Sequence, residues 1–268
     1  MLLRMEDLDP QRCRKEYAHQ IREDLRWLGL DWDQEQPYQS DRSEAYAEAF
    51  SRLSAQGLIY PCYCTREELH AASAPHAADG TAVYAGTCRD LTAAERAKKT
   101  KTPAWRIRVP DRVISVEDGV QGRYAEDLAR DCGDFILRRA DGVFAYQLAV
   151  VLDDDAGGVT EVTRGRDLLS SSPRQRYLQD LLGLSYVSYF HVPLLVDETG
   201  RRLSKRDGDL DLAALRQRMD APELLGRLAW AAGLLEEYRS VTAADLIPLF
   251  RWDRVRREDL VIRRYFQV

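Results

Sequence analysis

A basic loop near residue 200 carries the densest set of chemically useful side chains in this 268-residue sequence. Ser204 and Lys205 lie there among arginines, directly after the turn-forming stretch Asp197 to Gly200. A hydroxyl, an ammonium and flanking guanidiniums can hold a triphosphate and stabilise the charge that develops on departing pyrophosphate. Because charge runs are usually solvated surface loops, this loop indicates a phosphate clamp only in combination with other motifs.

Three cysteines at short spacing form a second candidate group. Cys62 and Cys64 are one residue apart, and Cys88 follows in the stretch Tyr-Ala-Gly-Thr-Cys. Clustered cysteines in a reducing compartment favour metal binding, and the odd total of five argues against a disulfide framework. Three thiolates and one further ligand would complete a tetrahedral structural zinc site. The alternative interpretation is three small buried cysteines.

Two charged residues follow predicted strands, which is where open α/β sheets bind ligands. Glu6 comes after the apolar opening of the chain, and Arg164 comes after a strand predicted around residues 159–163. Arg164 could instead form a surface ion pair. Tyr146 opens an apolar run, in which core packing is the usual role of a tyrosine. These three residues are candidates for binding a small charged ligand.

Hydrophobic periodicity predicts the elements that must position these residues. Helices are expected at residues 17–28, 41–56 and 173–182. The apolar stripe of the first helix consists of Tyr17, Ile21, Leu25 and Leu28. The second helix begins with a capping box formed by Asp41 and Glu44. Strands are expected at residues 105–109, 134–137, 158–162 and 191–196.

The alternation of strands and helices favours an α/β fold with a mostly parallel sheet, a central insertion and a tail that is helical throughout residues 211–268. A hydrophobic content of 45% and a charged content of 31% are typical of a soluble globular chain. The net charge of −5 excludes a basic field over the whole molecule, and no apolar run is long enough to span a membrane. We therefore expect a cytosolic protein.

Four ordered sequence blocks resemble the catalytic domain of class I glutamyl-tRNA synthetases. They are Arg4 to Asp9, Phe144 to Asp154, Gly158 to Leu169 and Arg202 to Arg206. The last block stands where that family has its "KMSKS"-type loop. The resemblance implies a Rossmann-like parallel sheet with a zinc-containing insertion and a C-terminal helical region. The implied parts are the two catalytic segments 1–57 and 111–200, the insertion 58–110, and the loop with its helical tail, 201–268.

Two features are similar to the short branch of this family, the glutamyl-queuosine tRNA(Asp) synthetases. Only about sixty residues follow Lys205, too few for the helical anticodon-binding domain of the long branch. The cysteine pattern also matches the zinc site of the short branch, and the resemblance implies Tyr84 as the fourth ligand. His76 and His70 are chemical competitors for that position.

The resemblance also implies a two-step reaction and a role for each candidate residue. Glu6 would accept the ammonium of L-glutamate, Arg164 would bind its side-chain carboxylate, and Tyr146 would hydrogen-bond the bound amino acid. Ser204 and Lys205 would contact ATP, which Mg²⁺ accompanies. Glutamate would be activated without tRNA and then transferred to the queuosine of tRNA(Asp). Further expectations are a monomer, a cytoplasmic location and no membrane partner.

The chain departs from the family pattern at its start. The family begins with a strand, an arginine-rich turn and a "HIGH"-type helix that cradles ATP, and none of these precedes Arg4. We expect the natural start to lie upstream, and we expect the present chain to activate glutamate poorly. Two other interpretations are a zinc-containing tRNA-binding pseudoenzyme and a fragment of a discriminating glutamyl-tRNA synthetase.

Overall fold

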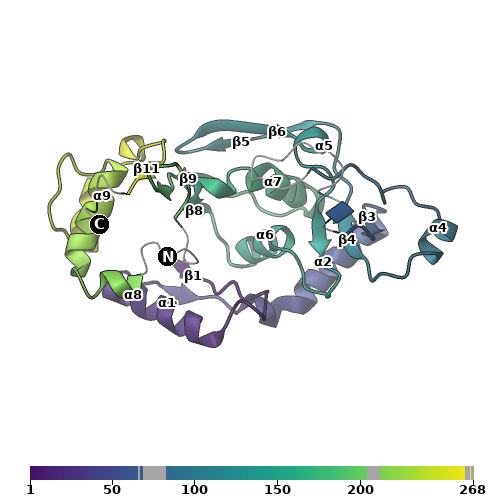
Figure 1. Cartoon of the computed structure of the whole chain (residues 1–268), viewed down its shortest axis with the longest axis horizontal. Coiled ribbons are helices and arrows are strands. Elements are labelled where there is room, and N and C mark those ends of the chain that lie inside the picture. Colours follow the sequence, from purple (N-terminus) through teal and green to yellow (C-terminus); the bar gives the residue numbers. More distant parts are fainter. Residues whose placement is uncertain (66, 69–82, 204–211, 263–265, 267–268) are drawn as a thin grey trace.

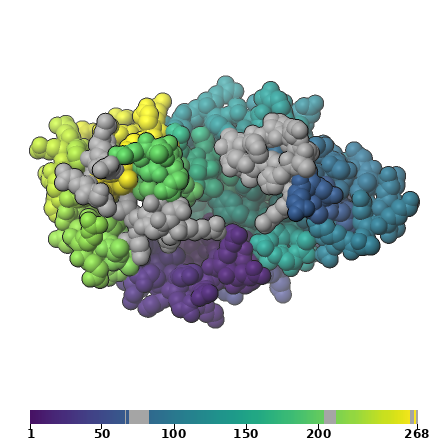
Figure 2. Space-filling view, in the orientation of Figure 1, coloured from purple at the N-terminus to yellow at the C-terminus, as the bar shows by residue number. Residues whose placement is uncertain are grey.

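The computed structural model describes residues 1–65, 67–68, 83–203, 212–262 and 266. In these residues strands and helices alternate along much of the chain, so the prediction of an α/β protein is confirmed. The molecule is elongated (Figure 1). Residues of the predicted insertion form one end of it, and residues after 212 form the opposite end (Figure 2).

The largest sheet of the described residues contains four strands in the order β6-β5-β9-β8. These strands are β5 (Val113–Asp118), β6 (Gly122–Asp127), β8 (Glu161–Gly165) and β9 (Ser188–Val192). β9 pairs in parallel with both β8 and β5, whereas β5 and β6 form an antiparallel hairpin. Gly122, whose φ is +80°, helps to close the hairpin, and so short a connection makes the two strands run antiparallel. The sheet is therefore mixed, not mostly parallel as predicted.

Helices α6 (Tyr146–Ala156) and α7 (Ser171–Leu182) lie side by side at the centre of the molecule (Figure 1). α7 also packs against β5. Together with α2 (Ser43–Ala55), these helices bury the main hydrophobic core. Leu148 and Leu178 are fully buried in it, and burying a leucine side chain contributes roughly 1.5–3 kcal/mol. The core therefore supports α6, the helix that begins at Tyr146.

α1 (Lys15–Trp27) confirms the first predicted helix, but only part of its predicted apolar stripe is buried. Tyr17 and Ile21, which belong to the predicted apolar stripe, are 54% and 42% exposed. Leu28, the last residue of that stripe, packs together with Trp27 against a cluster formed mainly by C-terminal residues. The predicted stripe is therefore confirmed at the end of the helix but not at its start.

α2 confirms the second predicted helix, and Tyr46 and Leu53 are fully buried on it. The predicted capping box was wrong. A 3-10 turn, η1 (Gln39–Arg42), leads directly into α2, so Asp41 lies inside that turn and no side chain caps the helix. Such a turn supplies carbonyl groups to the first amides of a helix, which then needs no side-chain cap.

A second sheet is antiparallel and includes strands of the predicted insertion. Its strands, in spatial order, are β3 (Ile59–Cys62), β4 (Ala104–Ile107) and β7 (Ile136–Arg138). β4 and β7 overlap two of the predicted strands. The short helices nearby in the sequence are α4 (Ala93–Ala97) and α5 (Leu128–Asp131). Because β3 ends at Cys62, this sheet positions the first of the candidate metal ligands.

The described part of the C-terminal region is not helical throughout, so that prediction was wrong. Its elements are α8 (Leu212–Leu215), α9 (Ala221–Ala232), α10 (Ala243–Leu246), η4 (Ile247–Leu249), η5 (Trp252–Arg254) and β11 (Leu260–Val261). β11 pairs in parallel with β10 (Leu195–Val196). The backbone N–H of Leu260 donates to the carbonyl of Leu194 at 2.8 Å. This long-range pairing provides hydrogen-bond partners for backbone N–H and C=O groups, which in a helix would pair with residues nearby in the sequence.

The chain opens with β1 (Leu2–Leu3), which pairs in parallel with β2 (Gln34–Glu35). The N-terminus lies near the middle of the molecule, and α1 runs between the two strands in sequence (Figure 1). Arg4 and Glu6 therefore come directly after a strand, in a central position. Among the described residues, no helix has the length and apolar character needed to cross a membrane.

Candidate active site and metal centre

Arg164 lies near the carboxyl end of β8 and is half-buried. Its Nε donates to His191 Nε2 at 2.9 Å, and its Nη2 donates to Ser172 Oγ at 2.9 Å. Its Nη1 donates to the Tyr146 hydroxyl at 3.3 Å, and the guanidinium lies over the Tyr189 ring, 4.7 Å from the ring centroid. No carboxylate of the described residues forms an ion pair with Arg164, so the surface ion pair considered from the sequence is not formed there.

His191 is fully buried beside Arg164. Its Nδ1 lies 2.5 Å from Oδ2 of Asp118, and Oδ1 of that carboxylate accepts the backbone N–H groups of Val120 and Gln121 at 3.0 and 2.8 Å. Burial acts to raise the pKa of Asp118, but these hydrogen bonds outweigh it and hold the pKa below its ordinary value. Sequence reasoning missed both residues. Arg164 and His191 are register partners on β8 and β9, and this pairing became visible only in the fold.

A second charged group follows β1. Arg4 donates to Oδ1 of Asp154 at 2.7 Å and to Oε1 of Glu6 at 3.1 Å. Asp154 lies on α6 and is 5% exposed. Burial raises the pKa of Asp154, whereas the charge of Arg4 acts against this shift. The Glu6 side chain is 42% exposed, so it presents an accessible carboxylate beside a buried ion pair.

Tyr146 interacts with charged residues of both groups, Arg164 and Glu6. Burial raises the pKa of Tyr146; the charge of Arg164 acts against this shift and the charge of Glu6 adds to it. The charge of Arg164 also acts on Asp154. The structure thus brings Glu6, Tyr146 and Arg164 into one electrostatically connected region, with Asp154 as an addition. The substrate role of each residue stays a prediction.

Ser204 and Lys205 lie outside the described residues, so their contacts with ATP also stay a prediction. The start of their loop is described. Arg202 forms an ion pair with Asp167, which belongs to the 3-10 turn η2 (Arg166–Leu168) that follows β8. The basic loop therefore begins beside the strand end that carries Arg164.

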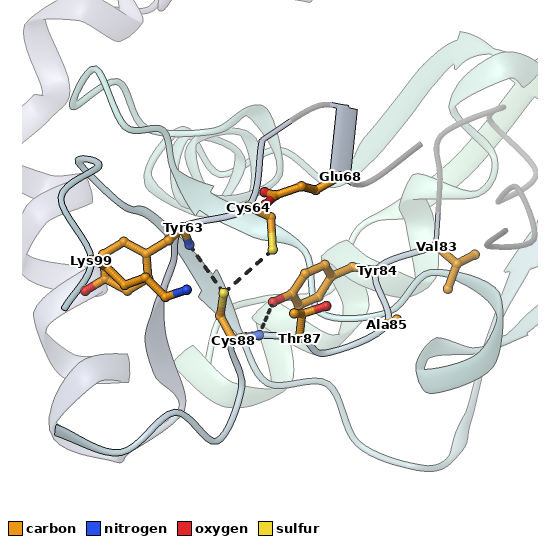
Figure 3. Close-up of a pocket in the computed structure, with 9 residues that line it drawn as sticks. All are labelled: Tyr63, Cys64, Glu68, Val83, Tyr84, Ala85, Thr87, Cys88 and Lys99. Carbon is orange, nitrogen blue, oxygen red and sulfur yellow. Dashed lines mark hydrogen bonds between the residues drawn. The ribbon is translucent and has the colours of Figure 1, made fainter. Parts of the chain in front are cut away.

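The three predicted cysteines converge at one point. The sulfur atoms of Cys62, Cys64 and Cys88 all lie within 4.8 Å of one another. The Tyr84 hydroxyl is 3.5 Å from Cys62 Sγ and accepts the backbone N–H of Cys88 at 2.7 Å. Figure 3 shows Cys64, Cys88 and Tyr84 pointing toward one another in the wall of a pocket of about 190 Å³. The sulfur atoms of Cys64 and Cys88 are 3.7 Å apart.

Two of these separations match the edges of a tetrahedral metal site. In a tetrahedral zinc site with Zn–S bonds of about 2.3 Å, two sulfur atoms lie about 3.8 Å apart, and an oxygen ligand at about 2.0 Å lies about 3.5 Å from a sulfur. The sulfur–sulfur distance of 3.7 Å and the sulfur–oxygen distance of 3.5 Å match these edges. Tyr84 is thus a geometric candidate for the fourth ligand. Its competitors His70 and His76 lie outside the described residues.

The surroundings of the cluster act in opposite directions on its ligands: they lower the pKa of Cys62 and raise the pKa values of Cys64 and Tyr84. Cys62, Tyr84 and Cys88 are each at most 5% exposed, and Arg106 lies over the Tyr84 ring, 3.9 Å from its centroid. Burial acts to raise the pKa of Cys62, but the hydrogen bond with Tyr84 and the charge of Arg106 outweigh it and lower the pKa. Burial raises the pKa of Cys64 to about 12. A metal cation would favour the thiolate form of Cys64, because metal ligation requires ionised cysteines.

A larger, open pocket of about 520 Å³ lies between the start of the chain and α2. Its wall combines carboxylates, hydroxyls, an aromatic ring and the guanidinium of Arg138. The lining residues include Asp7, Ser40, Ser43, Glu44, Ala47 and Phe144. Asp7 directly follows Glu6, so this pocket adjoins the accessible carboxylate of the candidate active site along the chain.

Comparison with known proteins shows what the chain is similar to. Residues 1–251 match the family described as tRNA synthetases class I (E and Q), catalytic domain. The chain is 50% identical over 262 residues to the glutamyl-Q tRNA(Asp) synthetase of Nitratidesulfovibrio vulgaris, covering 93% of this chain and 81% of that protein. It is 45% identical over 278 residues to the glutamyl-Q tRNA(Asp) synthetase of Symbiobacterium thermophilum, covering 97% and 85%.

Solved structures share the fold. A glutamate-tRNA synthetase from Elizabethkingia anophelis matches with a TM-score of 0.79, and a glutamate tRNA ligase from Elizabethkingia meningosepticum matches with a TM-score of 0.76. Both are 23% identical to this chain, and each comparison covers 97% of this chain but 60% of the solved chain. This chain therefore spans 60% of their length, and the likeness shows the fold alone.

Proposed function

This chain belongs to the class I tRNA synthetases of the E and Q type, and from that membership we propose that it uses ATP to join L-glutamate to the queuosine of tRNA(Asp). Membership makes the chain an aminoacyl-tRNA synthetase-like ligase, whose partners are an amino acid, ATP and tRNA. It also confirms the class I synthetase fold implied by the sequence motifs. The choice of glutamate and queuosine is the proposal, and the names of the relatives support it.

Arg164 is the observation that carries the choice of glutamate. It is a half-buried permanent cation whose described partners are neutral, and its hydrogen bonds to the Tyr146 hydroxyl and the Leu168 carbonyl are long, at 3.3 and 3.4 Å. A substrate carboxylate can replace or share these weak bonds and form a charge-assisted pair. Glu6 offers the opposite charge for the substrate ammonium.

The proposed reaction has two steps and needs no covalent intermediate on the enzyme. An oxygen of the glutamate α-carboxylate attacks the α-phosphorus of ATP, and the bond to pyrophosphate breaks. A hydroxyl of the queuosine cyclopentenediol then attacks the activated carbonyl, AMP leaves, and the hydroxyl proton is released. We assign the phosphate contacts to Ser204 and Lys205, with Mg²⁺ bound to ATP. Activation proceeds without tRNA, and catalysis consists of positioning and charge stabilisation.

We also propose that Cys62, Cys64, Cys88 and Tyr84 hold one structural zinc ion. Four protein ligands would close the coordination shell, so the ion would stabilise the chain rather than react with substrate. The effect would reach the active site through the second sheet. β3 ends in Cys62, β4 pairs with both β3 and β7, and β7 is bridged to Phe144 just before α6.

For the second substrate we assign the open pocket that begins at Asp7. Its carboxylates and hydroxyls can hydrogen-bond a diol, and its volume of about 520 Å³ lies in the usual range for ligand sites. The remaining parts of the proposal are tRNA(Asp) as the partner, a monomeric enzyme and a cytoplasmic location, where ATP and tRNA are available.

A bulky residue in this pocket would separate the two steps. Ala47 is exposed and lines the pocket from α2. We expect Ala47→Trp to lower glutamate transfer to tRNA at least tenfold while glutamate binding stays within twofold of the wild-type value. Filter-bound radiolabelled tRNA and calorimetry measure the two quantities. Equal transfer by the variant and the wild type would remove this pocket from the proposal.

Transfer of radiolabelled glutamate to tRNA(Asp) with and without queuosine tests the proposed function. Labelling of the queuosine form alone supports it. Labelling of the 3′ end of tRNA(Glu) would identify a discriminating glutamyl-tRNA synthetase instead, and tRNA binding without any labelling would identify the pseudoenzyme.

A further inference from the structure

A buried acid–imidazole pair adjoins the candidate site without any role in the steps above. Asp118 is the last residue of β5, and His191 lies on the neighbouring β9. They are 5% and 0% exposed, and neither can reach solvent to act as an acid or base. Burying two such groups is unfavourable unless each is fully hydrogen-bonded. Their hydrogen bonds therefore show what the pair does.

The hydrogen bonds define the protonation state of the imidazole. A guanidinium can only donate, so the 2.9 Å contact from Arg164 Nε requires that Nε2 of His191 carry a lone pair. The proton of a neutral imidazole must then be on Nδ1, which lies 2.5 Å from the Asp118 carboxylate. If His191 were doubly protonated, its Nε2–H would face the Nε–H of Arg164, and no hydrogen bond could form between them. Asp118 thus selects the tautomer that accepts from Arg164.

The pair is held rigidly by the backbone of the sheet. The Asp118 carboxylate accepts N–H groups from Val120, Gln121 and His191, in addition to the imidazole. The Gln121 side chain donates to the backbone carbonyl of His191 at 2.9 Å. The position of the Nε2 lone pair is therefore determined by the register of β5 and β9, not by a mobile side chain.

Arg164 has a competing partner nearby. The charge of Arg164 acts on the buried carboxylate of Asp154, although the two side chains form no ion pair. A guanidinium released from His191 could turn toward Asp154 and become neutralised. Because His191 Nε2 accepts the Nε–H of Arg164, the guanidinium keeps its orientation, and its Nη groups donate to Tyr146 and Ser172.

We propose that Asp118 and His191 are positioning residues that hold the Arg164 guanidinium in the orientation that receives the substrate carboxylate. This inference rests on the proposed function, because it assumes that Arg164 binds glutamate. It adds two residues, from two strands, to the determinants of glutamate affinity. It also predicts that the acceptor atom at Nε2, rather than the bulk of the imidazole, carries the effect.

Two substitutions of His191 separate the acceptor from the bulk. In His191→Gln the amide oxygen can take the place of Nε2 and still accept from Arg164. In His191→Asn the shorter amide can take the place of Nδ1, so the contact with Asp118 is kept and the acceptor is lost. We expect His191→Asn to weaken glutamate binding at least tenfold in calorimetry, and His191→Gln to stay within threefold of the wild type.

Asp118→Asn tests the tautomer. Its amide can donate to Nδ1 and move the imidazole proton to Nε2, against Arg164, so we expect the same loss of at least tenfold. Nitrogen NMR of the histidine side chains should show a protonated Nδ1 in the wild type and a protonated Nε2 in this variant, with the His191 signal assigned by its absence in His191→Gln.

The melting temperatures of the variants distinguish positioning from a purely structural role. Positioning predicts that His191→Asn and His191→Gln melt within a few degrees of one another but differ in glutamate affinity. Wild-type affinity in His191→Asn, or losses in both variants that follow their melting temperatures, would overturn the inference while leaving the proposed function intact. Absence of glutamate binding by the wild type would overturn both.

Discussion

At the scale of single residues, Arg164 and Glu6 present opposite charges to one region of the molecule and differ in how they are held. Arg164 donates four hydrogen bonds to neutral groups and stacks on Tyr189. Within the described part of the chain Glu6 pairs with Arg4 alone, and its side chain is 42% exposed. The cation is thus held in a defined orientation, whereas the carboxylate remains accessible to a ligand.

Replacing Arg164 by lysine keeps the charge and removes the planar fork. Because a lysine cannot bind a carboxylate with two parallel N–H groups, we expect Arg164→Lys to weaken glutamate binding about 10- to 100-fold, or about 1.4–2.8 kcal/mol. Calorimetry of glutamate binding measures the effect. Arg123→Lys is the matched control, since Arg123 is an exposed residue of β6 whose side chain is 71% accessible. Equal affinities in both variants would show that Arg164 does not bind the substrate.

At the scale of elements, the contact between Tyr84 and Gly133 connects the metal cluster to the main body. The two residues form an isolated parallel bridge, and Gly133 has a φ of +69°. A Cβ atom at Gly133 would lie 2.4 Å from the Tyr84 carbonyl oxygen. Only glycine permits so close an approach of the two backbones. The position of the Tyr84 phenol thus depends on a residue almost fifty positions away.

Gly133→Ala should therefore damage the cluster as well as the local backbone. The positive φ alone costs about 1–2 kcal/mol of unfolding free energy, and the shift of the Tyr84 backbone adds to this cost. Gly122→Ala is the matched control, because Gly122 has a φ of +80° but nothing within 4 Å of a Cβ. We expect urea unfolding to show the larger loss for Gly133→Ala, and metal analysis to show less bound zinc in that variant alone. Identical behaviour of the two variants would contradict this expectation.

The metal centre itself gives a second prediction at this scale. Removing one sulfur ligand lowers zinc affinity strongly, so we expect purified Cys88→Ser to lose the single zinc ion and to melt at a lower temperature. Cys13→Ser is the control, since Cys13 lies outside the cluster. Elemental analysis of both proteins checks the result. Full metal content in Cys88→Ser would rule out the proposed ligand set.

At the scale of the whole molecule, buried tyrosine–aspartate pairs link elements that are far apart in the sequence. The Tyr46 hydroxyl on α2 donates to Asp153 on α6 at 2.8 Å, and the Tyr60 hydroxyl on β3 donates to Asp134 at 2.6 Å. Both phenols are at most 2% exposed. Burial and the neighbouring carboxylate raise the pKa of each phenol above its ordinary value. The first pair joins two helices of the main core, and the second joins β3 to the residue pair that precedes β7 in the second sheet. Both pairs make the stability of the protein depend on pH.

The sign of that dependence follows from proton binding. Above pH ~10 the unfolded chain loses the phenolic protons of Tyr46 and Tyr60, while the folded chain keeps them, so the free energy of unfolding falls as pH rises. The expected slope is about 1.4 kcal/mol per pH unit for each phenol. Tyr60→Phe should remove its share of this slope. Urea unfolding between pH 8 and 11 measures the slope of the unfolding free energy against pH. Absorbance at the phenolate band shows whether the two phenols ionise in the folded protein, and their ionisation there would contradict the prediction.

Much of the local structure of this chain was predictable from sequence alone. The helices around α1, α2 and α7 and the strands around β4, β7, β8 and β9 lie close to their expected positions, with ends shifted by a few residues. Motif order was sufficient to predict the family. Both kinds of information are local, because periodicity and motifs depend on neighbours within a few residues of one another.

Tertiary structure alone decided which side chains meet. Asp118 and His191 are 73 positions apart, and Arg4 and Asp154 are 150 apart, so no local pattern could pair them. The strand register and the packing of α6 create these contacts and thereby determine the orientation of Arg164. The strand β11 also depends on a long-range contact, because its partner β10 lies some 65 residues earlier in the chain. The sequence determined which chemical groups are present, and packing determined which of them act together, since burial selects the pairs whose hydrogen bonds can be satisfied.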